Sequence, residues 1–301
     1  MSHENHGILR KKSGTQLMAE AYDREFPGLL QVLRESCKSV GVRFRYEEQI
    51  SENPLLIRVF GLRLSNMKFI INNSIFGNSP ELNIGVLVLR GVDNNGESSK
   101  VIDSIRNEEK RIREEFVSEK LSQEPKINSW RQVYKSFGVK PKEYKSSVES
   151  LYKRILKEDE LRHINKVVDI YNYISLKHML PVGGEDLDKI QGDIQLTYAG
   201  DNEPAVLLLG DKEEKSPEEG EIIYKDEISA ICRRFNWREA TRTKLTEDTK
   251  DLILVIEGLP PITNEDVDNI LNEMKELIGE CCGGDITKFI LNRDNPEIDL
   301  G

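Results

Sequence analysis

The sequence predicts an α+β fold, a mixed sheet with flanking helices, preceded by a small N-terminal α/β appendage. The predicted elements run as one strand, several helices, a group of strands and a last helix, unlike a regular βαβ repeat. The 301 residues, 38% of them apolar, suffice for one large core, or for one domain and an appendage. The first block carries no recognisable motif. We therefore divide the chain into an appendage at 1–65, a domain at 66–290 and a tail at 291–301.

The first part of the chain predicts a helix and three strands. Apolar residues recur at nearly helical spacing between 15 and 40, although Pro27 interrupts them. Short strand-like runs follow at 55–60 and 68–71. The apolar run from Ile84 to Gly91, closed by an Asp-Asn-Asn-Gly turn, is typical of a buried strand.

The rest of the chain changes from helical to β-rich character near Gly192. Before it, amphipathic patterns predict helices at about 98–121, 130–137, 147–156 and 165–178. After it, short β-rich runs separated by glycines and acidic turns lie at 194–198, 205–209, 221–224, 228–233 and 252–256. A final helix at about 264–278 stops before a Gly-Gly pair.

Charge is distributed unevenly along the chain, which has a formal net charge of -10. Residues 100–166 hold 17 Lys and Arg against 12 Asp and Glu, whereas residues 167–301 hold 14 against 30. A basic segment can face phosphate even in an acidic protein. The alternative is a set of solvated helix faces, and charge alone does not separate the two.

Several kinds of site are not supported by the sequence. It has no run of about 18 apolar residues, so we expect no membrane span. The four cysteines form no Cys-x-x-Cys pair and the N-terminus lacks a secretory apolar stretch, so we expect a cytoplasmic protein. Four histidines, and no P-loop, dinucleotide or zinc-protease fingerprint, lead us to expect no metal and no cofactor.

The segment from Asn165 to Ile194 carries the clearest functional pattern. A helix here would have one polar face and one apolar face. The polar positions are Asn165, Asp169 and Asn172, and the apolar ones are Val167, Ile170 and Ile174. A polar stripe in an otherwise apolar helix is costly to bury unless it binds something. The following Pro-Val-Gly-Gly, ending at Gly184, predicts a turn where backbone amides approach a ligand.

A second cluster lies between Arg233 and Arg238. Its three arginines lie beside Phe235 and Trp237, which suits a phosphate and a stacked base. The alternative is a strand-end loop whose arginines pair with the acidic half of the chain. Alternatives exist for other candidates too: Trp130-Arg131 could belong to an amphipathic helix with a core tryptophan, and Asn172 and Asp186 could cap and brace the turn.

Four linked motifs resemble the B3/B4 domain of the bacterial phenylalanyl-tRNA synthetase β subunit, and more closely the free-standing B3/B4-domain proteins. They are Trp130-Arg131, Val168–Asn172, Pro181–Asp186 and Arg233–Arg238. The resemblance extends from about residue 65 to residue 290. It implies a partner, the aminoacylated 3′ end of a tRNA, and metal-free hydrolysis of a mischarged amino acid.

The resemblance places the family's functional positions only in part. Its Thr-Asn pair falls on Tyr171 and Asn172, its pocket histidine on Gly183, and its strand-end glutamate near Glu257. The amino-acid specificity is therefore not carried over. The implied catalytic residues are Asn172 and Glu257. The implied substrate-binding residues are Trp130, Arg131, Tyr171, Gly183, Gly184, Asp186, Arg233, Trp237, Arg238 and Thr243.

Three functions remain open at this point. The first is a trans-acting aminoacyl-tRNA deacylase. The second is a non-catalytic RNA- or tRNA-binding module, which the loss of the family's pocket histidine favours. The third is a protein that binds a free amino acid or another small cationic ligand, which the acidic C-terminal half favours. The sequence does not identify the amino acid, the tRNA or the oligomeric state.

Overall fold

The computed structural model describes residues 67–301, and its central element is the four-stranded antiparallel sheet. Its strands are β2 (Asn83–Arg90), β3 (Val182–Asp186), β8 (Leu252–Gly258) and β9 (Asp285–Leu291), in the order β3-β8-β2-β9. Successive residues of a strand point to opposite faces, and both faces of β2 are buried. This explains why its sequence is a continuous apolar run.

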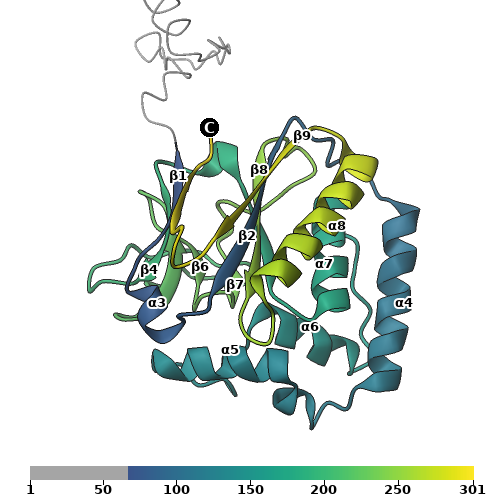
Figure 1. Cartoon of the computed structure of the whole chain (residues 1–301), viewed down its shortest axis with the longest axis horizontal. Coiled ribbons are helices and arrows are strands. Elements are labelled where there is room, and N and C mark those ends of the chain that lie inside the picture. Colours follow the sequence, from purple (N-terminus) through teal and green to yellow (C-terminus); the bar gives the residue numbers. More distant parts are fainter. Residues whose placement is uncertain (1–66) are drawn as a thin grey trace, which may run out of the picture. The chain divides into compact units, whose positions relative to one another are not determined.

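The second sheet has six strands and mixed directions. They are β1 (Lys68–Ile71), β4 (Ile194–Tyr198), β5 (Ile222–Lys225), β6 (Ala230–Arg233), β7 (Arg238–Glu239) and β10 (Glu297–Asp299), in the order β10-β1-β4-β5-β6-β7. The pair β1 and β4 is parallel and the other pairs are antiparallel. Figure 1 shows this sheet on one side of the four-stranded sheet and helices on the other.

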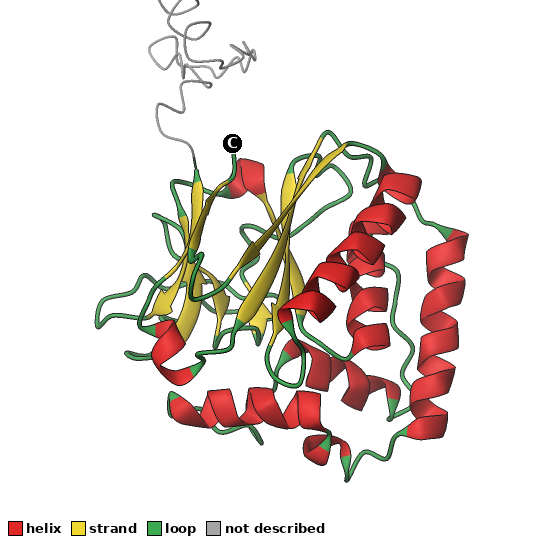
Figure 2. Ribbon diagram, in the orientation of Figure 1, coloured by secondary structure: helices red, strands yellow, loops and turns green. Residues whose placement is uncertain are grey.

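The helices are α3 (Ile75–Asn78), α4 (Ser99–Glu115), α5 (Pro125–Ser136), α6 (Ser147–Ile155), α7 (Lys166–His178) and α8 (Asn264–Cys282). Two short 3-10 turns lie at Leu121–Gln123 and Leu187–Lys189. The ribbon diagram shows α4, α7 and α8 together beside the four-stranded sheet (Figure 2). None of the described helices has the length and apolar character needed to cross a membrane.

The apolar core is divided by the four-stranded sheet. Leu87, Leu254 and Ile256 face the helices and join one cluster, whereas Val86, Val88 and Ile253 face the second sheet and join another. Each fully buried aliphatic side chain contributes roughly 1.5–3 kcal/mol. Because of this alternation, the four-stranded sheet packs against the helices on one face and against the second sheet on the other. The candidate site lies between the two sheets.

Helix α7 follows directly from its sequence signals. The side chain of Asn165 caps its N-terminus by accepting a hydrogen bond from the amide of Val168 at 3.0 Å. The helix ends at Met179, which has a left-handed backbone with φ of 53°. Val167 and Ile170 are fully buried. This arrangement fixes the angle at which Tyr171 and Asn172 leave the helix.

Most predicted elements are confirmed, as is the mixed α+β fold, whose strands form two sheets. Three expectations need correction. The expected turn at Gly183-Gly184 is wrong: both glycines are extended in β3, because the chain reverses earlier, at Met179. Residues 205–209 form only isolated bridges instead of a strand. The helix expected over 98–121 ends at Glu115.

Two further features concern the ends of the chain. The segment 291–301, expected to be a tail, contains β10, whose residues pair with β1 from Lys68 to Ile70. The whole appendage at 1–65 lies outside the described residues, together with Asn66. It includes the helix expected at 15–40 and the strand-like run at 55–60. The division into appendage and domain stays a prediction.

Candidate functional site

A cavity of about 440 Å³ opens between the two sheets and is bordered by α6 and α7. The four-stranded sheet contributes the face that carries Gly183, Glu185 and Ile253, and the second sheet contributes Tyr224 and Cys232 from β5 and β6. The exposed lining is mostly apolar, with a small number of polar side chains. Such a mixture of apolar walls and few polar groups is typical of small-molecule sites.

The structure brings seven of the twelve predicted site residues into the lining of this cavity. They are Tyr171, Asn172, Gly183, Gly184, Trp237, Arg238 and Glu257. They come from α7, β3, β7 and β8 and from the turn before β7, and lie up to 86 positions apart in the chain. The remaining five, Trp130, Arg131, Asp186, Arg233 and Thr243, do not line it.

Trp130 and Arg131 are held by the protein itself. Trp130 is 2% exposed and packs edge-on against Phe235, with ring centroids 5.0 Å apart. Nη1 of Arg131 donates to both carboxylate oxygens of Glu149, at 2.8 and 3.1 Å. The interpretation that these two residues hold a nucleotide is replaced by the alternative, an amphipathic helix with a core tryptophan.

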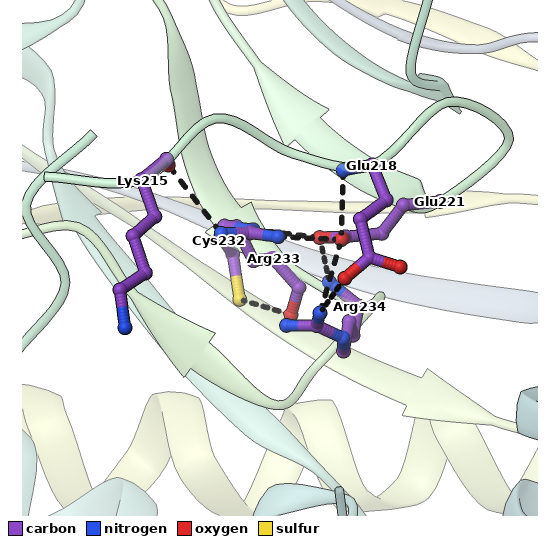
Figure 3. A network of polar contacts seen from close by, with 6 residues as sticks. All are labelled: Lys215, Glu218, Glu221, Cys232, Arg233 and Arg234. Carbon is purple, nitrogen blue, oxygen red and sulfur yellow. Dashed lines mark hydrogen bonds and ion pairs between the residues drawn. The ribbon is translucent and has the colours of Figure 1, made fainter. Parts of the chain in front are cut away.

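Arg233 and Arg234 are held in a buried ionic network, drawn in Figure 3. Arg233 donates from Nε and Nη2 to the two oxygens of Glu221, at 2.8 and 2.7 Å. The Arg234 amide donates to Glu221 at 3.1 Å, and its guanidinium donates to Glu218 at 2.9 Å. Two-point pairing between guanidinium and carboxylate is strong and directional. Arg233 is therefore committed to structure rather than to a phosphate.

Asp186 and Thr243 are also internal. One oxygen of Asp186 accepts from the Asp188 amide at 3.0 Å, and the other accepts from the hydroxyl of Thr249 at 2.8 Å. Thr243 is fully buried, and the peptide oxygen of Thr243 accepts from the Asp186 amide at 2.9 Å. Asp186 thus caps and braces the end of β3, as the alternative interpretation of the sequence has it.

Aromatic and cationic groups gather at the side of the cavity near β7. The guanidinium of Arg238 lies 4.6 Å from the ring centroid of Trp237 and pairs with Asp211 at 2.6 Å. The Arg234 guanidinium stacks 3.8 Å from the ring centroid of Tyr144. These contacts hold Trp237 in place while part of its surface stays accessible. A flat aromatic surface in this position can stack with a base.

Glu257 stands at the end of β8 and is held by two donors. The hydroxyl of Tyr224 donates to its Oε1 at 2.5 Å, and Nδ2 of Asn236 donates to its Oε2 at 2.5 Å. Tyr134 in turn donates to Oδ1 of Asn236 at 3.0 Å, which fixes the orientation of that amide. Burial raises the pKa of Glu257 to about 7, although the two donors favour the charged form. The carboxyl is therefore poised between its two protonation states at neutral pH.

A second acidic region was not predicted from the sequence and consists of Glu185 and Glu239. Both line the cavity, one from β3 and the other from β7. Burial raises the pKa of Glu239 to about 7. Burial first, and then the charge of Glu239, raise the pKa of Glu185 well above its usual range. Only strand alternation could have indicated them, since Glu185 shares a face with Gly183.

Tyr171 and Asn172 occupy the α7 wall. Burial raises the pKa of Tyr171 well above 10, so its hydroxyl stays protonated. Asp169, expected on the same polar stripe, does not line the cavity; its Oδ2 hydrogen-bonds with Nδ1 of His163 at 2.5 Å, and its Oδ1 accepts from the Ile164 amide at 3.2 Å. The polar stripe therefore has two uses: Asp169 braces the helix start, and Asn172 faces the cavity.

A basic segment borders the cavity on its α6 side. Between residues 135 and 157 the chain has seven Lys and Arg against two Asp and Glu. One of those two acids, Glu149, is fully buried and paired with Arg131. Arg154, at the end of α6, lines the cavity and is exposed. The segment therefore presents a net positive surface next to an acidic interior.

Metal coordination finds no support in the part of the chain that the structure describes. Between residues 67 and 301, no group of three or more His, Cys, Asp or Glu side chains is arranged to hold an ion.

A family model for the B3/4 domain matches residues 129–283, from α5 to the end of α8. The chain is also similar to phenylalanine–tRNA ligase beta subunits. That of Fusobacterium nucleatum is 26% identical over 156 residues, covering 44% of this chain and 19% of the relative. That of Colwellia psychrerythraea is 35% identical over 95 residues, covering 31% and 11%. The chain thus spans about a fifth or less of the length of these relatives.

Among solved structures, an N-terminal fragment of the phenylalanyl-tRNA synthetase beta subunit from Pyrococcus horikoshii covers 75% of this chain and 54% of its own length. Its sequence identity is 14% and its TM-score is 0.40.

Proposed function

Because the chain belongs to the B3/4 domain family, we propose that it binds the aminoacylated 3′ end of a tRNA at this cavity and hydrolyses the aminoacyl ester. The observation that carries the proposal is Glu257: a carboxyl with a pKa of about 7, oriented by Tyr224 and Asn236, on the wall of a largely apolar cavity. A general base works best when its pKa lies near the working pH.

The reaction follows from that protonation state. The ionised Glu257 accepts a proton from a water molecule, whose oxygen adds to the carbonyl carbon of the ester. The bond between that carbon and the ribose oxygen then breaks, and the ribose oxygen takes up the proton from Glu257. In this proposal Asn172, which lines the cavity from α7, hydrogen-bonds with the substrate. Apolar walls strengthen these interactions because they exclude bulk water.

The surroundings of the cavity suit the nucleic-acid part of such a substrate. Trp237, braced by Arg234 and Arg238, offers a flat surface for the terminal base. The basic segment 135–157 lies beside the α6 wall and can contact phosphates. The acidic interior and the basic border thus match the two ends of an aminoacyl-tRNA terminus, a cationic amino acid ester and an anionic backbone.

The test is a release assay on a panel of tRNAs, each charged with a non-cognate amino acid. Full-length protein is incubated with each one, and the released amino acid is measured against buffer and against the same protein carrying Glu257→Gln. We expect faster release from at least one member of the panel with the wild-type protein. Release at the buffer rate across the whole panel would refute hydrolysis.

A second candidate function is binding of a free amino acid or another small cation. One observation favours it: Arg131 and Arg233, expected to contact RNA, pair with Glu149 and Glu221 instead. A thermal-shift screen with amino acids would detect such a ligand. Retention of tRNA with a steep salt dependence, but without release of the amino acid, would instead identify a non-catalytic tRNA-binding module.

A further inference from the structure

The carboxyls of Glu185 and Glu239 form a pair that neither the mechanism nor the family resemblance uses. They come from different sheets, since β3 belongs to the four-stranded sheet and β7 to the six-stranded one. Glu185 is only 7% exposed, yet it lines the cavity. The fold therefore places two acids from distant segments at one wall of the same chamber.

The glycines of β3 make this approach possible. A Cβ on Gly183 would lie 2.9 Å from Oε1 of Glu239, closer than real side chains come. The amide of Gly184 donates to the same oxygen at 3.4 Å. Glycine in a strand interior often marks a site where another group comes close to the backbone. Here the group that comes close is the Glu239 carboxyl.

Within the described part of the chain, the pair forms no salt bridge. Among residues 67–301, no Lys, Arg or His forms an ion pair with either carboxyl, and Oε2 of Glu185 has no hydrogen-bond partner. The neighbouring Arg242 donates to Asp226 at 2.7 and 3.0 Å, and its charge lowers the pKa of Glu185 only against the larger effect of burial. A buried carboxyl oxygen without a partner carries a free-energy cost that a ligand donor can remove.

The charge of the pair limits the ligand. Burial and the charge of Glu239 raise the pKa of Glu185, because desolvation and repulsion oppose full ionisation of both carboxyls. The pair therefore favours a ligand that brings a positive charge. Together with the unfilled acceptor on Glu185, this suits a group with one positive charge and several N–H donors.

We infer that Glu185 and Glu239 form a subsite for a primary ammonium group. Its identification with the α-ammonium of an aminoacyl ester rests on the proposed function. Glu257, whose two oxygens already accept from Tyr224 and Asn236, is left to act on the ester. In this cavity, Glu185 and Glu239 thus recognise the amine, and the separate Glu257 performs the chemistry.

The test compares ligands that differ only in the amine. Two non-hydrolysable adenosine amides, carrying phenylalanyl or alanyl at the 3′ position, are each paired with a counterpart that lacks the amine, 3-phenylpropionyl or propionyl. Dissociation constants are measured by calorimetry on the full-length chain. We expect the amine to improve affinity at least about tenfold in the wild type, as one charge-assisted contact would.

Variants assign that gain to the pair. In Glu185→Gln with Glu239→Gln, the affinity ratio between amine and desamino ligand should fall to about 1–2. The single variants keep side-chain volume and give the same readout if the double variant does not fold. Glu219→Gln, an exposed carboxyl in the loop before β5, is the matched control and should keep the wild-type ratio.

The outcomes separate this inference from the proposed function. A wild-type ratio below about twofold, no binding of any probe at millimolar concentration, or an unchanged ratio in the double variant would overturn the ammonium subsite. A clear ratio in a protein that releases no amino acid from any charged tRNA would keep the subsite and remove the hydrolase. Release of the amino acid without discrimination of the amine would keep the hydrolase and remove the ammonium subsite.

Discussion

Two buried acidic positions in this molecule have opposite surroundings. Glu221 is 3% exposed and accepts from two arginines. Glu185 is 7% exposed, lies beside Glu239, and is paired with no cation in residues 67–301. Both sites bury charge at a cost, but only the first is compensated within the protein. The comparison indicates that the first site is structural and that the second is completed by a ligand.

The largest expected effect comes from breaking the compensated site. Glu221→Gln removes the charge that faces Arg233 and Arg234, whose side chains are 4% and 5% exposed. We expect the free energy of unfolding to fall by about 3–5 kcal/mol, the usual cost of leaving buried charges unpaired. Urea denaturation measures it, with Glu219→Gln as control. A loss below about 1 kcal/mol would mean that the network is dispensable.

At the second site, loss of a carboxyl should raise the free energy of unfolding instead of lowering it. Burial raises the pKa of Glu239 from 4.5 to about 7, so the folded state holds a proton that the unfolded state has released between those values. The contribution of Glu239 to the free energy of unfolding is therefore largest below pH 4.5, and it is lost as the pH rises to about 7. Glu239→Gln removes this loss and should be more stable above pH 7 by on the order of 3 kcal/mol.

Urea denaturation at several pH values tests this sign. The stabilisation by Glu239→Gln should be largest at pH values above 7 and should shrink toward pH 4.5. A difference between variant and wild type that is the same across this range would show that Glu239 does not titrate as described. The Gln variant keeps an acceptor for the Gly184 amide, so packing is little changed.

The adjacent glycines of β3 sharpen the comparison. A Cβ on Gly184 would lie 2.4 Å from Cδ2 of Leu254 and 3.1 Å from the peptide oxygen of Ile253, so Gly184→Ala should cost about 1–3 kcal/mol. A Cβ on Gly183 meets only the carboxyl end of Glu239, which can move. Gly183→Ala should cost less than about 1 kcal/mol but weaken discrimination of the amine. Equal thermal stability losses in both variants would contradict this assignment.

The smallest expected effect concerns the basic border of the cavity. Lys142→Glu should weaken tRNA binding by about 1 kcal/mol and reduce the slope of log affinity against log salt by about 1, provided that Lys142 contacts a phosphate. Lys275→Glu makes the same charge change on α8 and should leave the slope unchanged. Filter binding at several salt concentrations measures both. Identical slopes in the two variants would exclude segment 135–157 from the interface.

The sequence predicted the elements well because their signals are local. Strand 194–198 agrees in both bounds, and α8 begins where its Thr263 capping box lies. The approach of the two sheets was not predictable, since it depends on contacts between distant segments. The turn expected at Gly183-Gly184 was wrong for a related reason: Gly183 makes room for Glu239 and Gly184 makes room for Leu254, and both partners are distant in the sequence.

The candidate site was predicted in part, for physical reasons that differ between residues. Asn172 follows from helix periodicity, which needs no knowledge of the rest of the chain, whereas Tyr171 follows from the family resemblance. Arg131 and Arg233 were expected to face a ligand because the sequence alone does not show which buried carboxylates they pair with. Glu185 was missed because it lies in an acidic half of the chain, where a carboxyl is usually solvated.

The central claim is that Glu257 performs chemistry in this cavity, and a single-turnover assay tests it most directly. The most reactive charged tRNA from the panel is mixed with excess wild-type protein or with Glu257→Gln, and tRNA affinity is measured in parallel. We expect the rate of amino-acid release to fall at least about 10²-fold, the usual contribution of a general base, while affinity stays within about twofold. Release at the wild-type rate by the Gln variant would contradict the account.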